Sequence, residues 1–207
     1  MQVDFVFQIA ILIMSVVIHE VSHGYTASYL GDQTAKYQGR LTLNPLKHLD
    51  FVGSFLVPSL SYLLGGFIFG WAKPVPYNPY NLKPGRWSEA MVAGAGPAAN
   101  IALALIFGLL LRFGVSSEAS WAGPAFVQIT ALIVFINILL AIFNLVPIPP
   151  LDGSKLLFSV FPDRLHKFRE FFERYGLILV LVFIFLLWQF IFPVVTWLFR
   201  LITGVAF

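Results

Sequence analysis

Cysteine is absent from this sequence of 207 residues, and charged residues are few. Without thiols the chain can form no disulfide, no thiolate metal site and no cysteine nucleophile. Aspartate, glutamate, lysine and arginine make up 11% of the residues, against about 25% in an ordinary soluble domain. This low charge content, together with 58% hydrophobic residues, predicts an α-helical polytopic integral membrane protein.

Basic residues are not gathered in one patch either. They are distributed over short segments between apolar runs, so they indicate membrane topology rather than nucleic-acid binding. No such segment is longer than about 30 residues, too short for an appended soluble domain. The first apolar run lacks the basic leading region of a signal peptide and is expected to be retained. We therefore expect a single intramembrane domain over residues 1–207.

Five apolar runs reach the length of about 20 residues that a membrane-spanning helix needs. They cover approximately residues 5–30, 51–72, 88–113, 124–148 and 176–203. The run at 51–72 is rich in glycine and proline, which favours a re-entrant segment over a straight helix. If it enters and leaves on one side, eleven loop cations lie together on the cytoplasmic side and one lies opposite. We expect about four to five transmembrane helices plus this re-entrant segment.

Two segments leave alternatives open. Residues 40–44 alternate between polar and apolar side chains and precede Pro45, which fits either a short β-strand able to pair with a partner chain or an irregular interfacial loop. Pro193 lies within the last apolar run, so that run is either one kinked helix or two shorter pieces.

The most specific motif lies inside the first apolar run. Residues 19–23 read His-Glu-Val-Ser-His, and about 0.002 such His-Glu-x-x-His strings are expected by chance at this composition. On a helix, positions i and i+4 are neighbours, so His19 and His23 can share one zinc ion. Glu20 would lie beside the ion as the general base for its water. The alternative, two core histidines with a snorkelling glutamate, would place an unpaired carboxylate in hydrocarbon at a cost of several kcal/mol.

A catalytic zinc site generally takes three protein ligands, so one more is expected. Asp152 follows the proline-rich segment 147–150, which breaks the fourth run and can aim this side chain back into the bundle. A re-entrant second run makes the first and fourth runs cross in the same direction, which brings His23 and Asp152 to one membrane face. A turn or cap role for Asp152 is the alternative.

The remaining polar positions give weaker indications. His48 and His166 lie in hydrophilic loops, away from the expected site. Asn144 can donate to a developing oxyanion or to a bound peptide, or else bridge two helices. Counted from Phe5, His19 lies about 21 Å into a hydrocarbon layer about 30 Å thick, which predicts a site recessed below the cytoplasmic boundary.

Together these residues resemble the site-2 protease family of intramembrane zinc metalloproteases, peptidase family M50. Five segments carry the resemblance, and the first and last are the most specific. They are HEVSHG (19–24), LNPLKHLD (43–50), WAKPVP (71–76), AGPAAN (95–100) and NLVPIPPLDG (144–153). The PDZ and CBS modules that other members carry have no counterpart here, which implies a compact catalytic core.

The resemblance implies one Zn²⁺ per chain, held by His19, His23 and Asp152, with Glu20 as the catalytic acid and base. Asn144 and Asn100 match family positions that assist substrate handling. The implied partners are the lipid bilayer and transmembrane protein substrates, commonly single-pass regulators shortened by an earlier cleavage. The implied location is multi-pass in a membrane, the cell membrane in a prokaryote. The hypothesis from another class is a metal-binding membrane transporter or scaffold without proteolysis.

Overall fold

Three long helices form the centre of the protein. The computed structural model describes residues 5–56, 60, 63, 72–85, 87–116, 122–160 and 166–205. The helices α1 (Phe5–Tyr29), α4 (Ser88–Ser116) and α5 (Pro124–Leu145) are long and apolar enough to cross a membrane. At 1.5 Å per residue, each exceeds the hydrocarbon thickness of about 30 Å. The prediction of a helical, multi-pass membrane protein is therefore confirmed at this level.

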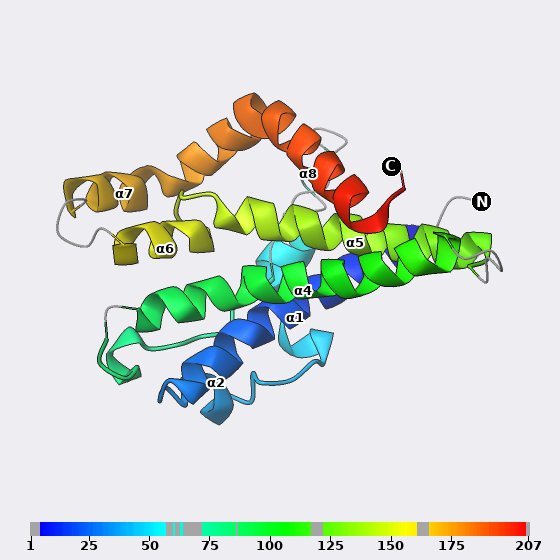
Figure 1. Cartoon of the computed structure of the whole chain (residues 1–207). Helices are drawn as coiled ribbons and strands as arrows, with labels where there is room; N and C mark the ends of the chain where they lie inside the picture. The colour runs from blue at the N-terminus through cyan, green and yellow to red at the C-terminus, as the bar shows by residue number, and fades with distance from the viewer. Residues whose placement is uncertain are drawn as a thin grey trace.

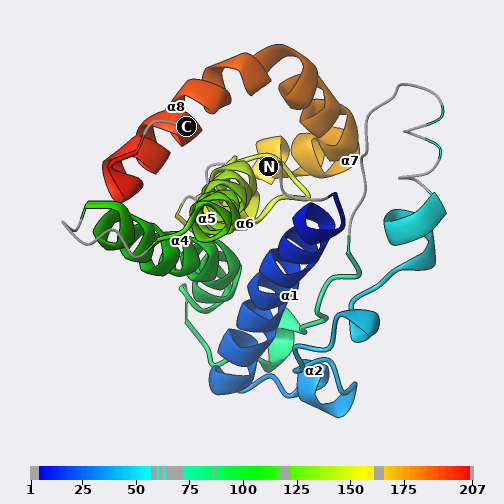
Figure 2. The same cartoon turned by 90° about the vertical axis from the view of Figure 1, so that its right-hand side faces the viewer.

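The last apolar run is bent rather than straight. It comprises α7 (His166–Val182), the π-helical turn η4 (Phe183–Leu187) and α8 (Trp188–Thr203). Its two arms, 174–186 and 189–203, meet at 70°, and Figures 1 and 2 show them arching over α5. Pro193 follows the bend by about one turn, where it cannot donate to the carbonyl of Gln189. The described residues have three continuous candidate spans, or four if this bent pair of helices counts as one span. The predicted number of four to five transmembrane helices is therefore not confirmed.

The chain leaves and re-enters the bundle at the same end between α1 and α4. Leu30, just after α1, accepts a hydrogen bond from the backbone N–H of Lys83, just before α4, at 2.7 Å. Segment 31–82 therefore makes no net crossing, as the predicted topology requires. The predicted re-entrant segment itself lies mostly outside the described residues, because 57–59, 61, 62 and 64–71 are not among them.

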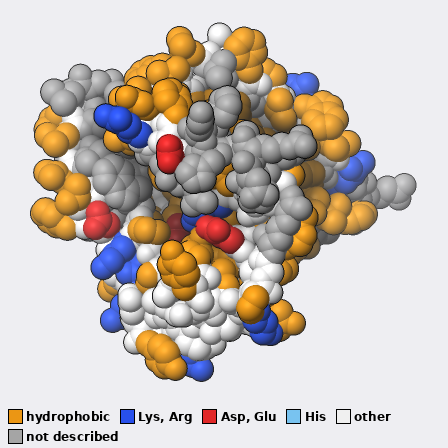
Figure 3. Space-filling model, turned by 90° about the vertical axis from the view of Figure 1, so that its left-hand side faces the viewer, with side chains coloured by type: hydrophobic (Ala, Val, Ile, Leu, Met, Phe, Trp, Pro, Cys, Tyr) orange, Lys and Arg blue, Asp and Glu red, His pale blue; other side chains and the backbone are white. Residues whose placement is uncertain are grey.

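Short elements lie in the connections between the longer helices, several of them at this end of the bundle. They are α2 (Thr34–Tyr37), η1 (Pro45–Lys47), η2 (Val52–Leu56), η3 (Pro79–Asn81) and α6 (Asp152–Val160). Figure 3 looks onto this end and shows charged side chains across it, with apolar side chains on its flanks. A polar end and apolar sides are what a helix bundle in a bilayer needs.

Of the two alternatives for residues 40–44, the short β-strand is wrong. This segment is irregular, and no strand occurs among the described residues. Local side-chain bonds occupy the backbone groups that a strand ladder would use. The Thr42 carbonyl accepts from His48 Nε2 at 2.8 Å, and the Asn44 N–H donates to Thr42 Oγ1 at 3.2 Å. Asn44 Oδ1 in turn accepts from the Leu46 N–H and caps η1.

The main apolar core lies where α4, α5 and α8 meet. Six buried residues form it, two from each helix: Ala104, Leu111, Val134, Ile138, Val195 and Phe199. Small residues let α4 approach its neighbours, and at Gly108 an added Cβ would collide with Ile202 of α8. Outside this core, α1, α4 and α8 keep large apolar side chains exposed, including Phe7, Leu110 and Trp197. Such faces suit contact with lipid.

Asp32 fastens the loop before α4 to the end of α1. Its Oδ1 accepts from the Thr34 N–H, Thr34 Oγ1 and Asn81 Nδ2, and its Oδ2 accepts from the Asn78 N–H at 2.8 Å. Burial raises the pKa of Asp32, but these hydrogen bonds outweigh it and lower the pKa below its usual value. The carboxylate therefore stabilises the folded state.

We expect Asp32→Ala to destabilise the protein by about 3 kcal/mol, since it leaves buried donors without an acceptor. Asp32→Asn keeps one acceptor oxygen, so its stability should lie between that of Asp32→Ala and that of the wild type. Because the folded-state pKa is the lower one, the wild-type advantage is complete above the unfolded pKa of about 3.9 and is lost as pH falls below it. Thermal unfolding in detergent at pH 7 and pH 3 measures this. Equal stability of the three proteins at pH 7 would contradict it.

Candidate metal centre

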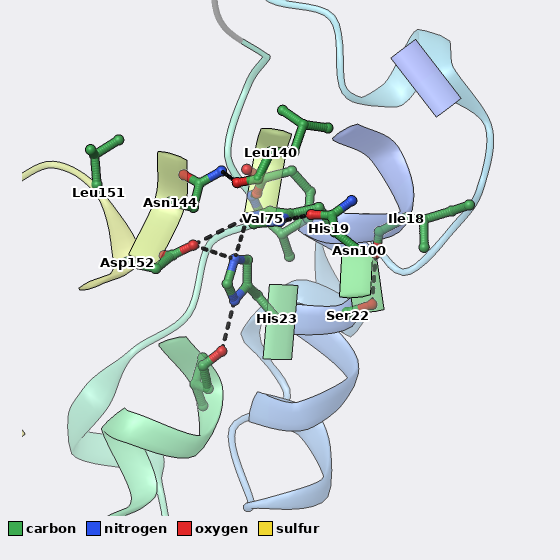
Figure 4. Close-up of polar contacts among 12 residues, drawn as sticks. Ile18, His19, Ser22, His23, Val75, Asn100, Leu140, Asn144, Leu151 and Asp152 are labelled. Carbon is green, nitrogen blue, oxygen red and sulfur yellow. Dashed lines mark hydrogen bonds and ion pairs between the residues drawn. The ribbon is translucent and has the colours of Figure 1, made fainter. Parts of the chain in front are cut away.

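Three donor atoms from distant parts of the chain converge on one point. His19 Nε2 lies 3.0 Å from His23 Nε2, and Asp152 Oδ2 lies 3.1 Å from the first and 3.2 Å from the second. All three residues are at most 8% exposed. Figure 4 shows Asp152 approaching the two imidazoles from α6, while both histidines belong to α1. Within the described part of the chain this is the cluster able to hold a metal ion.

The other nitrogen of each imidazole is already committed. His23 Nδ1 donates to the Val92 carbonyl at 2.7 Å, and His19 Nδ1 lies 2.6 Å from Asn100 Oδ1. Because a carbonyl oxygen only accepts, both Nδ1 atoms carry the proton and both Nε2 lone pairs are free. A metal-ligating histidine has this arrangement.

The donor set and its spacing fit a zinc ion. Ligands at 2.0 to 2.2 Å from a tetrahedral ion are about 3.3 Å apart, close to the three distances seen here. Two nitrogens and one carboxylate oxygen are also a ligand set of catalytic zinc sites. Space is kept by Gly96 of α4, where an added Cβ would lie 2.6 Å from His19 Nε2 and closer still to His23 Nε2.

The chain turns sharply to present Asp152. This residue opens α6, directly after the proline-rich segment that ends α5. The next residue, Gly153, lies so close to the Leu145 and Val146 carbonyls that a Cβ there would collide with them. The turn therefore places the Asp152 carboxylate against both imidazoles.

Glu20 lies beside the three donor atoms but is not one of them. Its Oε2 accepts from the Val75 backbone N–H at 2.8 Å, which holds the carboxylate from the side of loop 72–78. That loop is held in turn by Arg40, which donates to the Lys73 and Pro74 carbonyls. The loop thus fixes one oxygen of Glu20, and Glu20 also lines a cavity at this site.

A cavity of about 140 Å³ opens onto this site. Its ten lining residues are His19, Glu20, His23, Pro74, Val75, Tyr77, Asn144, Pro150, Asp152 and Lys155. Asn144 donates to the Leu140 carbonyl of its own helix at 3.0 Å, so the only hydrogen bond described for it does not bridge helices. Asn100 is absent from this lining and fully buried behind His19, so it is not placed to contact a substrate.

Two polar residues of the cavity were not predicted from the sequence. Tyr77 and Lys155 line the cavity, with the Lys155 ammonium 5.0 Å from the centre of the Tyr77 ring. Burial raises the pKa of Tyr77, so its hydroxyl remains a donor. Lys155 follows Asp152 by three residues on α6, and this helical spacing was a usable signal. For Tyr77 the sequence offered none, because loop 72–78 reaches the site only through the fold.

Comparison with known proteins agrees with this geometry. The model of peptidase family M50 matches residues 113–188. A protein of Bacillus subtilis that carries the name zinc metalloprotease YwhC is 39% identical over 83% of this chain and 76% of its own length. Two proteins named zinc metalloprotease Rip2 also match. That of Mycolicibacterium smegmatis is 38% identical over 72% of this chain and 55% of its own length. That of Mycobacterium tuberculosis H37Rv is 31% identical over 98% of this chain and 76% of its own length. No solved structure matches significantly.

Proposed function

We propose that this chain, which belongs to peptidase family M50 and is a zinc metalloprotease, hydrolyses peptide bonds within or near transmembrane segments of other membrane proteins. One observation carries the proposal: two of the three converging donor atoms lie inside α1, a candidate membrane span. A peptide bond that reaches them has to come from a segment inside or at the edge of the bilayer. The proposed ligands are His19, His23 and Asp152.

Glu20 is the proposed catalytic acid and base. When bound, zinc supplies Lewis acidity toward the scissile carbonyl and toward a water molecule, whose pKa falls to about 7. The Glu20 carboxylate takes the proton of the attacking water and delivers it to the leaving amide nitrogen, so that one water yields a carboxyl and an amine. The Val75 N–H keeps this carboxylate oriented during both transfers.

Asn144 is the proposed donor to the oxyanion. One of its two amide protons is used by the Leu140 carbonyl, which leaves the second for the charge that develops on the scissile carbonyl oxygen. Its place in the cavity lining, one residue before the end of α5, supports this role. The helix-bridging alternative for this residue has no described hydrogen bond in its favour.

The substrate has to unwind before it can be cut, since a helix hides its peptide bonds. Segments with helix-breaking residues near the cut are therefore the proposed substrates, and among them single-pass regulators already shortened by another protease. The active site is proposed to lie nearer the cytoplasmic face of the cell membrane. The grouping of basic residues at the end of the bundle that holds Asp152 supports this orientation.

Cleavage in proteoliposomes tests the proposal. The substrate is a synthetic single-pass helix with an Asn-Pro pair in one half, and mass spectrometry locates the cut. We expect cleavage within the membrane segment, inhibition by 1,10-phenanthroline and recovery on adding Zn²⁺. A second substrate with Leu-Leu in place of Asn-Pro should be cut more slowly. Zinc binding without cleavage, combined with metal flux across the liposome membrane, would instead support the transporter hypothesis.

A further inference from the structure

Three polar side chains meet in the middle of the bundle, one from each continuous span. Ser15 of α1 is 4% exposed, and Asn100 of α4 and Asn137 of α5 are fully buried. Burying polar groups at this depth is costly unless all of them are paired. None of the three lines the cavity, yet their hydrogen bonds lead to His19.

The orientation of the Asn137 amide is fixed by a backbone carbonyl. Its Nδ2 donates to the Ile133 carbonyl at 2.8 Å and to Ser15 Oγ at 3.0 Å. A carbonyl has no proton to give, so the nitrogen and not the oxygen of the amide has to face Ile133. The oxygen of Asn137 therefore faces Asn100.

The same logic fixes the next amide and then the imidazole. Asn100 Nδ2 donates to Asn137 Oδ1 at 2.8 Å and to the Ser15 carbonyl at 3.3 Å. Asn100 Oδ1 is thereby turned toward His19 Nδ1, 2.6 Å away. Because this oxygen only accepts, His19 Nδ1 has to carry the proton, and the Nε2 lone pair faces His23 and Asp152.

We infer that Asn137 is a positioning residue that sets the tautomer of His19 through Asn100, and so prepares its Nε2 to bind zinc. The inference rests on the proposed role of His19 as a metal ligand. His23 needs no such relay, because the Val92 carbonyl holds its Nδ1 proton directly. His19 has only a side-chain acceptor, which could flip, so it depends on the two bonds that Asn100 Nδ2 donates, the shorter of them to Asn137.

A purely structural role, in which these side chains only hold the helices together, makes a different prediction. Ser15→Ala removes one hydrogen bond between α1 and α5 but leaves the Ile133 carbonyl to orient Asn137. Asn137→Leu removes the nearer of the two oxygens that orient Asn100 and leaves only the Ser15 carbonyl at 3.3 Å. Asn137→Asp, as a neutral acid, can donate to Ile133 and keep an oxygen toward Asn100. A purely structural role predicts changes in stability without any change in the tautomer of His19.

The experiment uses protein labelled with ¹⁵N-histidine, whose four imidazoles give a simple spectrum. In metal-free protein, the ring shifts report which nitrogen of His19 is protonated, and chelator competition measures zinc affinity. We expect the wild type, Ser15→Ala and Asn137→Asp to keep the proton on Nδ1. Asn137→Leu should show a second tautomer and bind zinc about tenfold more weakly, at the lower end of the range for outer-shell partners.

Asn100→Leu gives a second route to the same answer if Asn137→Leu does not fold. It removes the acceptor of His19 itself, and we expect zinc affinity to fall about 10- to 100-fold. An unchanged tautomer and zinc affinity in a folded Asn137→Leu protein would overturn the inference while leaving the proposed function intact. Wild-type protein that shows the Nδ1 tautomer and binds zinc, but cleaves no transmembrane substrate, would instead overturn the proposed function alone.

Discussion

Glu20→Gln is expected to abolish proteolysis and to leave zinc binding unchanged. The carboxylate is not one of the three converging donor atoms, so the proposed ligand set stays complete. Glutamine has nearly the same shape, and its oxygen can still accept from the Val75 N–H, so loop 72–78 should stay in place. It cannot take a proton from water, and the loss of a general base costs about 100- to 10,000-fold in rate. Cleavage rate and zinc content of the same preparation measure both effects.

Two further variants make this result specific. Glu170→Gln on α7 makes the same chemical change away from the cavity and should cleave normally. Asp152→Asn removes the charge of a proposed ligand and should lose zinc along with activity. If Glu20→Gln cut the transmembrane substrate at the wild-type rate, the proposed mechanism would be wrong. If it lost its zinc, Glu20 would have to be a ligand instead of a base.

Gly96→Ala is expected to remove both zinc and activity by adding one methyl group. The new Cβ would lie 2.6 Å from Cε1 and Nε2 of His19 and even closer to His23 Nε2. The imidazoles cannot move aside freely, because their Nδ1 atoms are bound to Asn100 and to the Val92 carbonyl. Either the rings rotate away from Asp152 or α4 moves away from α1, and both changes separate the donor atoms. We expect zinc affinity to fall at least about 100-fold.

Gly94→Ala is the matched control two residues earlier on α4. A Cβ there would meet only Leu156 Cδ2 at 3.7 Å, an ordinary contact distance. This variant should keep its zinc and its activity, and it gains helix propensity of about 1 kcal/mol. Competition against a chelator of known affinity measures both proteins. Equal zinc affinity of the two variants would mean that α4 does not lie against the imidazoles as described.

Part of the fold could be predicted from the sequence because membrane helices are specified locally. A helix in lipid satisfies its own backbone, so length and apolar content alone identified the runs that became α1, α4 and α5. The same reasoning was less successful where side-chain hydrogen bonds compete with regular structure or where a helix bends. Residues 40–44 have the alternation of a strand, yet the bonds that His48 and Asn44 donate to Thr42 keep them irregular. The bend before Pro193 likewise needed the structure.

The candidate site divides in the same way. The spacing of His19, Glu20 and His23 follows from helix geometry and needs no tertiary information. Asp152 was predicted from the number of ligands that a catalytic zinc site takes and from the direction in which the first and fourth apolar runs cross the membrane. The structure places its Oδ2 within 3.2 Å of both imidazoles. Asn100 was predicted from the resemblance, but for substrate handling, whereas it lies buried behind His19.

By itself, the sequence determined a helical membrane protein with a zinc-hydrolase motif in its first span and a proposed third ligand 129 positions after His23. Only the tertiary structure decided what surrounds these ligands. Gly96 keeps the space for the imidazoles, Val75 orients Glu20, and Asn137 acts on His19 through Asn100. Each of these roles comes from a contact between segments far apart in the chain, where spacing along one helix carries no information. Packing of α1 against α4, α5 and the loop at their end creates them.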